Sequence, residues 1–136
     1  MKIHCGISRF LLVVCTSATL AAGYAAVSQA DTSTSNKWRI EFDGGANSDG
    51  EIVFRVTPEG GEPIDVNARI DDGTGENRVA SKVRDAFREQ LPDGAYHVEK
   101  DDGEDVLVKR RGDTPDFSME LVSSSVKSVD IDIERE

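Results

Sequence analysis

The stretch NRVASKVRDAFREQL, residues 77–91, predicts the one helix around which the rest of the chain is arranged. Its large apolar residues recur at every fourth position: Val79, Val83, Phe87 and Leu91. This spacing places them on one face of a helix, while most of the charged residues fall elsewhere. A lone helix of this length is marginal in water. Its apolar face therefore has to be covered, and the flanking segments supply a sheet.

Turn-forming residues mark both ends of the predicted helix. Before it, Thr74 and Asn77 are the candidate N-caps, and Glu76 places negative charge near the positive end of the helix dipole. After it, the Pro-Asp-Gly sequence at residues 92–94 ends the helix and turns the chain.

Alternating apolar and polar residues predict strands on both sides of the helix. In residues 37–43, for example, Trp38, Ile40 and Phe42 alternate with charged residues, which gives one buried and one solvated face. The same pattern predicts six more strands: residues 51–57, 63–70, 95–100, 105–110, 116–122 and 126–134.

Three strands, a helix and four more strands, joined by short connections, predict an α+β fold with mostly antiparallel neighbours. We expect one helix packed on a mainly antiparallel sheet of six to seven strands, in the order βββαββββ along the chain, or closing an open sandwich. The charged outer faces of the strands indicate that at least part of the sheet meets solvent on one side.

Residues 1–30 have the pattern of a secretory signal peptide. A basic start with Lys2 and Arg9 precedes an apolar run, and small residues precede an expected cleavage site after Ala30. The alternative is an uncleaved signal anchor, which the short and interrupted apolar run disfavours.

The remainder of the chain is expected to form a flexible lead-in, residues 31–36, and a single small domain, residues 37–136. Both cysteines, Cys5 and Cys15, lie in the predicted signal peptide, whereas small secreted eukaryotic domains are usually stapled by disulfides. We therefore expect a bacterial periplasmic or secreted protein that has no contact with the membrane after cleavage.

The charge of the exported chain restricts its partners. Residues 31–136 contain 14 of the 16 Lys and Arg residues and all 26 Asp and Glu residues, which gives a net charge of −12. Such a chain repels nucleic acid and favours encounter with a cationic exported protein. The alternative is that the charge only solvates the surface.

Few side chains are suited to catalysis or to metal binding. His97 is the only histidine after the predicted signal peptide, no Gly-x-Ser-x-Gly turn occurs, and zinc needs more His or Cys than the chain has. An acidic stretch contains weak calcium candidates, although its composition is also that of an ordinary turn. These candidates are Asp101, Asp102, Glu104 and Asp105. The sequence singles out no catalytic residue, no metal site of specific geometry and no cofactor-binding residue.

These observations favour a non-enzymatic binding or interaction module of the bacterial cell envelope. A structural subunit that assembles with itself through sheet edges is the first alternative. A small hydrolase that uses a pair of carboxylates is the second, and the lack of a recognisable nucleophile or metal set disfavours it.

Overall fold

The computed structural model describes residues 33–136. The predicted signal peptide, residues 1–30, and its expected cleavage site after Ala30 lie outside the described residues. The elements are β1 (Lys37–Asp43), β2 (Gly50–Pro58), β3 (Ile64–Ile70), α1 (Glu76–Gln90), β4 (Tyr96–Asp101), β5 (Asp105–Arg110), β6 (Phe117–Ser124) and β7 (Asp130–Arg135). The predicted α+β class is confirmed.

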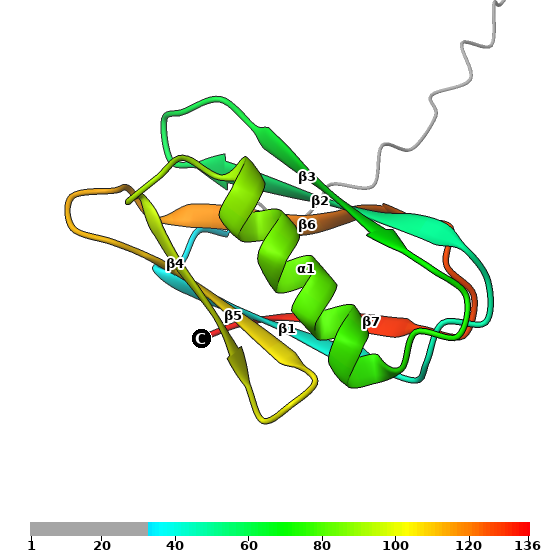
Figure 1. The fold of residues 1–136 in the computed structure, drawn as a ribbon. Coiled ribbons are helices and arrows are strands. Elements are labelled where there is room, and N and C mark those ends of the chain that lie inside the picture. Colours follow the sequence, from blue (N-terminus) through cyan, green and yellow to red (C-terminus); the bar gives the residue numbers. More distant parts are fainter. Residues whose placement is uncertain (1–32) are drawn as a thin grey trace, which may run out of the picture.

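The seven strands form two antiparallel sheets and not the expected single sheet of six to seven strands. One sheet has four strands in the order β4-β5-β1-β7, and the other has three in the order β3-β2-β6. The helix α1 lies across both sheets and contacts β3 in one and β1, β4 and β5 in the other (Figure 1).

The core lies where α1 and the two sheets meet. Phe54 of β2 contacts Phe87 of α1, with ring centroids 5.4 Å apart, and Phe42 of β1, with ring centroids 6.5 Å apart. Each layer therefore contributes one phenylalanine to a shared aromatic cluster, and aromatic pairs of this kind stabilise a core beyond the area that they bury. The four-residue period of α1 is confirmed, since Val79 and Val83 are also fully buried.

The predicted side-chain caps of α1 are wrong. Gly75 is the N-cap residue, and no side chain caps the helix. The hydroxyl of Thr74 is buried and donates instead to the carbonyl oxygen of Asp71, at 2.7 Å. Asn77 lies within the first turn, next to Glu76, the acidic residue expected there.

The strand β7 begins at Asp130 rather than at Val126. The backbone of Lys127 bonds to the loop between β1 and β2, because its carbonyl oxygen accepts from Asn47 and its N–H donates to the side chain of Ser48. The next residue, Ser128, has a left-handed backbone with φ of 66°. These residues therefore connect the sheets and do not extend the strand.

The segment before β1 is attached to β6. Ser35 and Phe117 form an isolated antiparallel bridge with two backbone hydrogen bonds of 3.0 Å each. The carbonyl oxygen of Asn36 also accepts from the backbone of Arg110. Residues 35 and 36, at the end of the expected lead-in, are thus held by hydrogen bonds.

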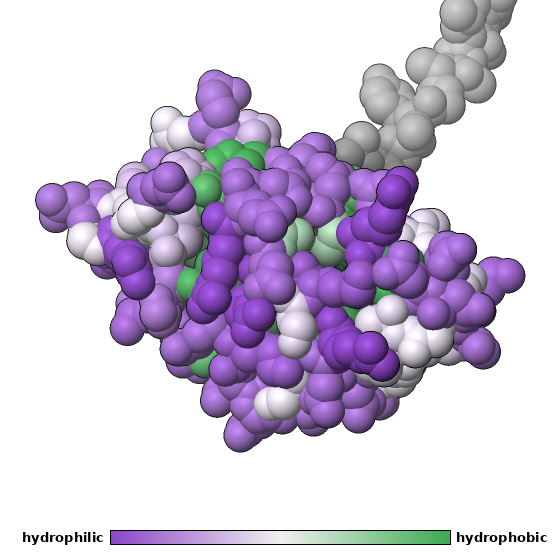
Figure 2. Space-filling view, viewed as in Figure 1, coloured by the Kyte–Doolittle hydropathy of each residue, from purple (hydrophilic) through white to green (hydrophobic). Residues whose placement is uncertain are grey.

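The face of the molecule that carries α1 is largely hydrophilic, and apolar residues show there only in small separate areas (Figure 2). Within residues 33–136, no helix has both the length and the apolar character that crossing a membrane requires.

Candidate functional site: an acidic face of the four-stranded sheet

The outer face of the four-stranded sheet is formed by the residues that alternate with the core residues. In β1, Ile40 and Phe42 are buried, so Glu41 and Asp43 point outward and are exposed. The strand β7 repeats the pattern, with isoleucines packed against the core and acidic residues between them.

The register of β1 and β7 sets carboxylates opposite carboxylates. Glu41 lies opposite Asp132, and Asp43 lies opposite Asp130. Residues directly opposite on one face of an antiparallel pair are close neighbours, and like charges in such positions destabilise the sheet. This pairing is therefore unfavourable in the free protein.

One row of carboxylates crosses the whole sheet. In the other half of the sheet, Asp101 of β4 lies opposite Asp105 of β5. The two halves are adjacent because Ile40 of β1 lies opposite Val106 of β5, which places Glu41 beside Asp105. Each strand thus contributes one carboxylate to the row.

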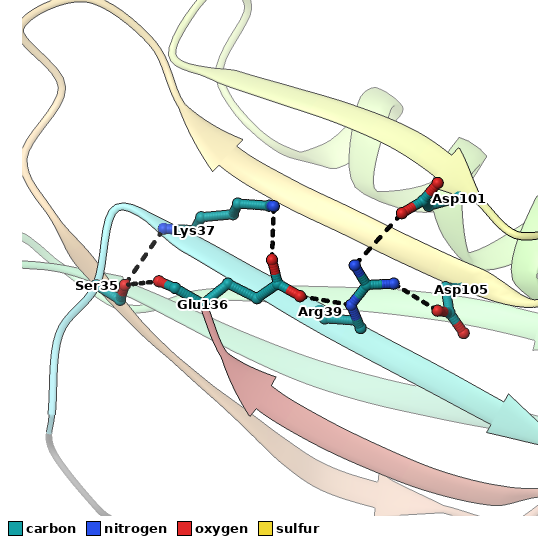
Figure 3. Close-up of polar contacts among 6 residues, drawn as sticks. All are labelled: Ser35, Lys37, Arg39, Asp101, Asp105 and Glu136. Atoms are coloured by element: carbon teal, nitrogen blue, oxygen red, sulfur yellow. Dashed lines mark hydrogen bonds and ion pairs between the residues drawn. The ribbon is translucent and has the colours of Figure 1, made fainter.

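Arg39 neutralises one side of this row (Figure 3). Its guanidinium donates to Glu136 at 2.6 Å, to Asp105 at 2.6 Å and to Asp101 at 3.3 Å. The hydrogen bonds with Glu136 and then Asp105 raise the pKa of Arg39 above its ordinary value. Glu136 also accepts from Lys37 at 2.6 Å, and the hydrogen bonds from Lys37 and Arg39 lower the pKa of its carboxyl group.

The other side of the row has no such cation. Among residues 33–136, no ion pair joins Glu41, Asp43, Asp130 or Asp132 to a Lys or Arg side chain. Partial desolvation and the charge of neighbouring carboxylates, first that of Glu134, raise the pKa of Glu41, and the charge of Arg39 offsets only part of this rise. We call Glu41, Asp43, Asp130 and Asp132 the uncompensated acidic patch.

A hollow of about 410 Å³ lies over this patch. It is lined by Glu41, Phe42, Asp43, Glu76, Glu104, Asp105, Asp130 and Asp132. Two acidic residues from outside the sheet face, at the start of α1 and in the β4–β5 turn, thus extend the acidic surface beyond the strands.

The weak calcium candidates are divided between different environments. Asp101 and Asp105 both bind Arg39, so a guanidinium already stands between them. Asp102 is exposed in a left-handed turn conformation with φ of 44°, and Glu104 lines the hollow. Within the part of the chain that the structure describes, no group of three or more His, Cys, Asp or Glu side chains is arranged to hold a metal ion.

Both ring nitrogens of His97 are engaged on the outer face of β4. Its Nδ1 lies 2.8 Å from Nη2 of Arg111, which is always a donor, so Nδ1 accepts. Its Nε2 then carries the proton and donates to Glu99 at 3.1 Å. A general base needs a free nitrogen directed at a nucleophile, and His97 has none in this arrangement.

The uncompensated acidic patch was not predicted from the sequence. The alternation in residues 41–43 and 130–134 shows that these acids point outward. It does not show that β1 and β7, which are almost ninety residues apart in the chain, are neighbours. The acidic alternation in both strands was the only signal available.

Comparison with known proteins assigns no family to this chain. A scan against protein-family models found no match, and a search of curated proteins found no significantly similar sequence. The role of the acidic face therefore has to follow from its own geometry and charge.

Proposed function

We propose that this chain is a non-enzymatic binding module of the bacterial cell envelope, periplasmic or secreted, whose acidic sheet face binds a cationic protein. The observation that carries the proposal is the register of β1 and β7, which sets Glu41 opposite Asp132 and Asp43 opposite Asp130. Holding like charges side by side costs stability in the free protein. A cationic partner removes that cost on binding, so the same arrangement favours the complex.

The shape and charge of the face suit a protein surface rich in Lys and Arg. The row of carboxylates extends over all four strands, which is wider than a single cation needs. The net charge of −12 on residues 31–136 attracts a cationic partner over a longer range and accelerates encounter. Such binding weakens as salt screens the charges.

A carboxylate hydrolase would have to use the same residues, and we do not favour it. The raised pKa of Glu41 beside other carboxylates resembles the arrangement of a pair of catalytic carboxylates. However, Glu41 is exposed, and within residues 33–136 the hollow that it lines is bordered only by Phe42 and other acidic residues, with no cation or hydroxyl group to orient a substrate.

The binding proposal is tested by capture of a partner. The purified protein is immobilised, and envelope and secreted extracts are passed over it at about 20 mM and about 150 mM NaCl, where screening differs strongly. We expect one stoichiometric partner with a basic surface, released as salt rises. The triple variant Glu41→Gln, Asp130→Asn, Asp132→Asn should weaken the affinity for this partner by about tenfold or more.

A second triple variant separates this face from the total charge. Glu59→Gln, Glu62→Gln and Asp93→Asn remove the same number of negative charges at exposed positions outside the four-stranded sheet. This control should bind nearly as well as the native protein. Equal losses in the two variants would show that only net charge matters, and no loss in the first would place the binding site elsewhere.

A further inference from the structure

A second interaction surface lies on the free edge of β6, in the three-stranded sheet. β6 pairs with β2 and forms one outer strand of the order β3-β2-β6. Its residues Leu121 and Val122 are 38% and 42% exposed, and they are the exposed large apolar residues of the described part of the chain. A β-bulge lies at this point, because Phe54 is opposite Leu121 while Val53 is opposite Ser123, which leaves Val122 without a partner in β2.

This edge lacks the charges that protect the other edges. Exposed edge strands usually carry charged residues that prevent pairing with another chain. The outer strands of the four-stranded sheet follow this rule, since β7 reads DIDIER and β4 reads YHVEKD. The edge strand β3 is covered by α1. β6 reads FSMELVSS, and its single charged residue, Glu120, lies 3.6 Å from Arg55 of β2.

The edge already accepts antiparallel pairing at its first residue. The N–H and the carbonyl oxygen of Phe117 both bond to the backbone of Ser35, at 3.0 Å each. This side of β6 therefore accepts a strand at Phe117, and residues 121–124 further along the same strand are exposed. Over residues 121–124, no other strand of the described chain pairs with this side.

We propose that the free edge of β6 pairs antiparallel with β6 of a second copy of this chain, which joins two three-stranded sheets into one of six strands. The composition of the edge favours a copy of itself over a charged partner. Residues 121–124 are Leu, Val, Ser and Ser, so nothing on them selects a basic or an acidic segment. A symmetric dimer requires a surface that is complementary to itself.

The register can satisfy this requirement. A two-fold axis between Val122 and Ser123 sets Leu121 of each copy opposite Ser124 of the other. The two Glu120 side chains then do not face one another, so pairing brings no like charges together at the interface. The overlap is short, which places this dimer in the class of small, transient interfaces.

Salt distinguishes this dimer from the complex proposed above. Each copy of residues 31–136 carries a net charge of −12, so two copies repel one another at low ionic strength. Screening therefore strengthens the dimer, whereas it weakens a complex between the acidic face and a cationic protein. Either proposal can fail while the other holds.

The test is sedimentation equilibrium of the purified protein over a series of concentrations, at about 20 mM and about 500 mM NaCl. We expect a reversible monomer–dimer equilibrium that shifts toward dimer as salt rises. Val122→Lys places a charge on the edge and should raise the dissociation constant by about tenfold or more. Glu99→Gln, on the outer face of β4, changes the net charge by the same amount and should leave the dimer unchanged.

Circular dichroism verifies that both variants fold. A second edge variant, Val122→Ser, removes the apolar side chain without adding charge and should weaken the dimer to a smaller degree. A protein that stays monomeric at every concentration and salt overturns the proposal. A dimer that dissociates on addition of salt, or that responds equally to Val122→Lys and Glu99→Gln, overturns it as well.

Discussion

Arg39 is the residue on which the four-stranded sheet depends for its charge balance. Arg39 belongs to β1, and its guanidinium binds carboxylates of β4, of β5 and of Glu136. Its side chain is only 18% exposed. Its main partner in β5, Asp105, is 13% exposed. Removing the guanidinium therefore leaves Asp105 without its ion-pair partner in a largely solvent-excluded place.

We expect Arg39→Met, which keeps the aliphatic stem, to lower the free energy of unfolding by about 1–3 kcal/mol. The measurement is urea denaturation near neutral pH. Arg69→Met is the matched control, because Arg69 is exposed and forms no ion pair within residues 33–136. It should change the same quantity by less than about 0.5 kcal/mol. Equal losses in the two variants would contradict the role given to Arg39.

The raised pKa of Glu41 predicts that the free energy of unfolding depends on pH. In the folded protein this pKa lies above the ordinary value of 4.5. As pH rises from that value, the unfolded chain loses the Glu41 proton first, so the folded state binds more protons. The contribution of Glu41 to stability therefore falls as pH rises through the window between its ordinary and its raised pKa.

The variant Glu41→Gln isolates this effect because the amide does not titrate. Its free energy of unfolding, relative to that of the native protein, should increase with pH across this window and become constant above it. The variant should thus be the more stable protein at neutral pH. Thermal denaturation between pH 4 and pH 7 measures the difference. A flat profile for Glu41→Gln would refute the electrostatic account.

At the scale of elements, Phe87 packs α1 onto the three-stranded sheet. Phe87 is fully buried and packs against Phe54 of β2. We expect Phe87→Ala to reduce the free energy of unfolding by roughly 3–5 kcal/mol, through lost transfer energy and the cavity left behind. Glu89→Ala, at an exposed position of α1, should be nearly neutral. An unchanged melting temperature in Phe87→Ala would disprove that the helix organises the fold.

The loop between β1 and β2 depends on a close backbone approach at Gly44. This residue has φ of 83°, and a Cβ added there would lie 2.5 Å from the carbonyl oxygen of Ser128. Gly60 has a similar φ of 71° but open space around it. Comparing Gly44→Ala with Gly60→Ala in urea denaturation thus separates the contact from the backbone conformation.

Gly60→Ala should cost about 1 kcal/mol, the usual penalty of a side chain in the left-handed region. Gly44→Ala should cost at least about 1–2 kcal/mol more, because the backbone of Ser128 has to move. Equal costs would show that the β1–β2 loop and the β6–β7 connection at Ser128 can move apart without loss of stability.

The individual elements were predictable because each has a local pattern. The four-residue period of α1 and the two-residue alternation of the strands both survive in the structure. The division into two sheets was not predictable, since alternation shows which face of a strand is buried but not which strand lies beside it. The start of β7 was missed for a related reason. Val126 is buried, but in a connection that bonds to the loop between β1 and β2.

At the scale of the whole molecule, the sequence determines the amount of charge, and the topology determines its location. The acids of β7 alternate with isoleucines, so their outward direction follows from the sequence. Their position beside Glu41 and Asp43 follows only from the pairing of β7 with β1. The negative charge of these strands was therefore predictable from the sequence, but its concentration at one position in the fold was not.

This distribution of charge predicts how stability responds to salt. Self-repulsion of residues 31–136 opposes folding, and screening reduces it. The melting temperature of the dilute monomer should therefore rise by about 2–5 °C between about 20 mM and about 500 mM NaCl. Dilution keeps the β6 edge unpaired, so dimer formation does not contribute to the rise.

The location of the charge is tested by comparing two variants of equal net charge. Glu41→Gln with Asp130→Asn and Asp132→Asn removes the close repulsions, so its melting temperature should be higher at low salt and less sensitive to salt. Three neutralisations at positions 59, 62 and 93 relieve only distant repulsions, which are weaker and already partly screened. That control should keep most of the native salt response. If both variants respond alike, the repulsion is spread over the whole surface and the register of β1 and β7 adds nothing to it.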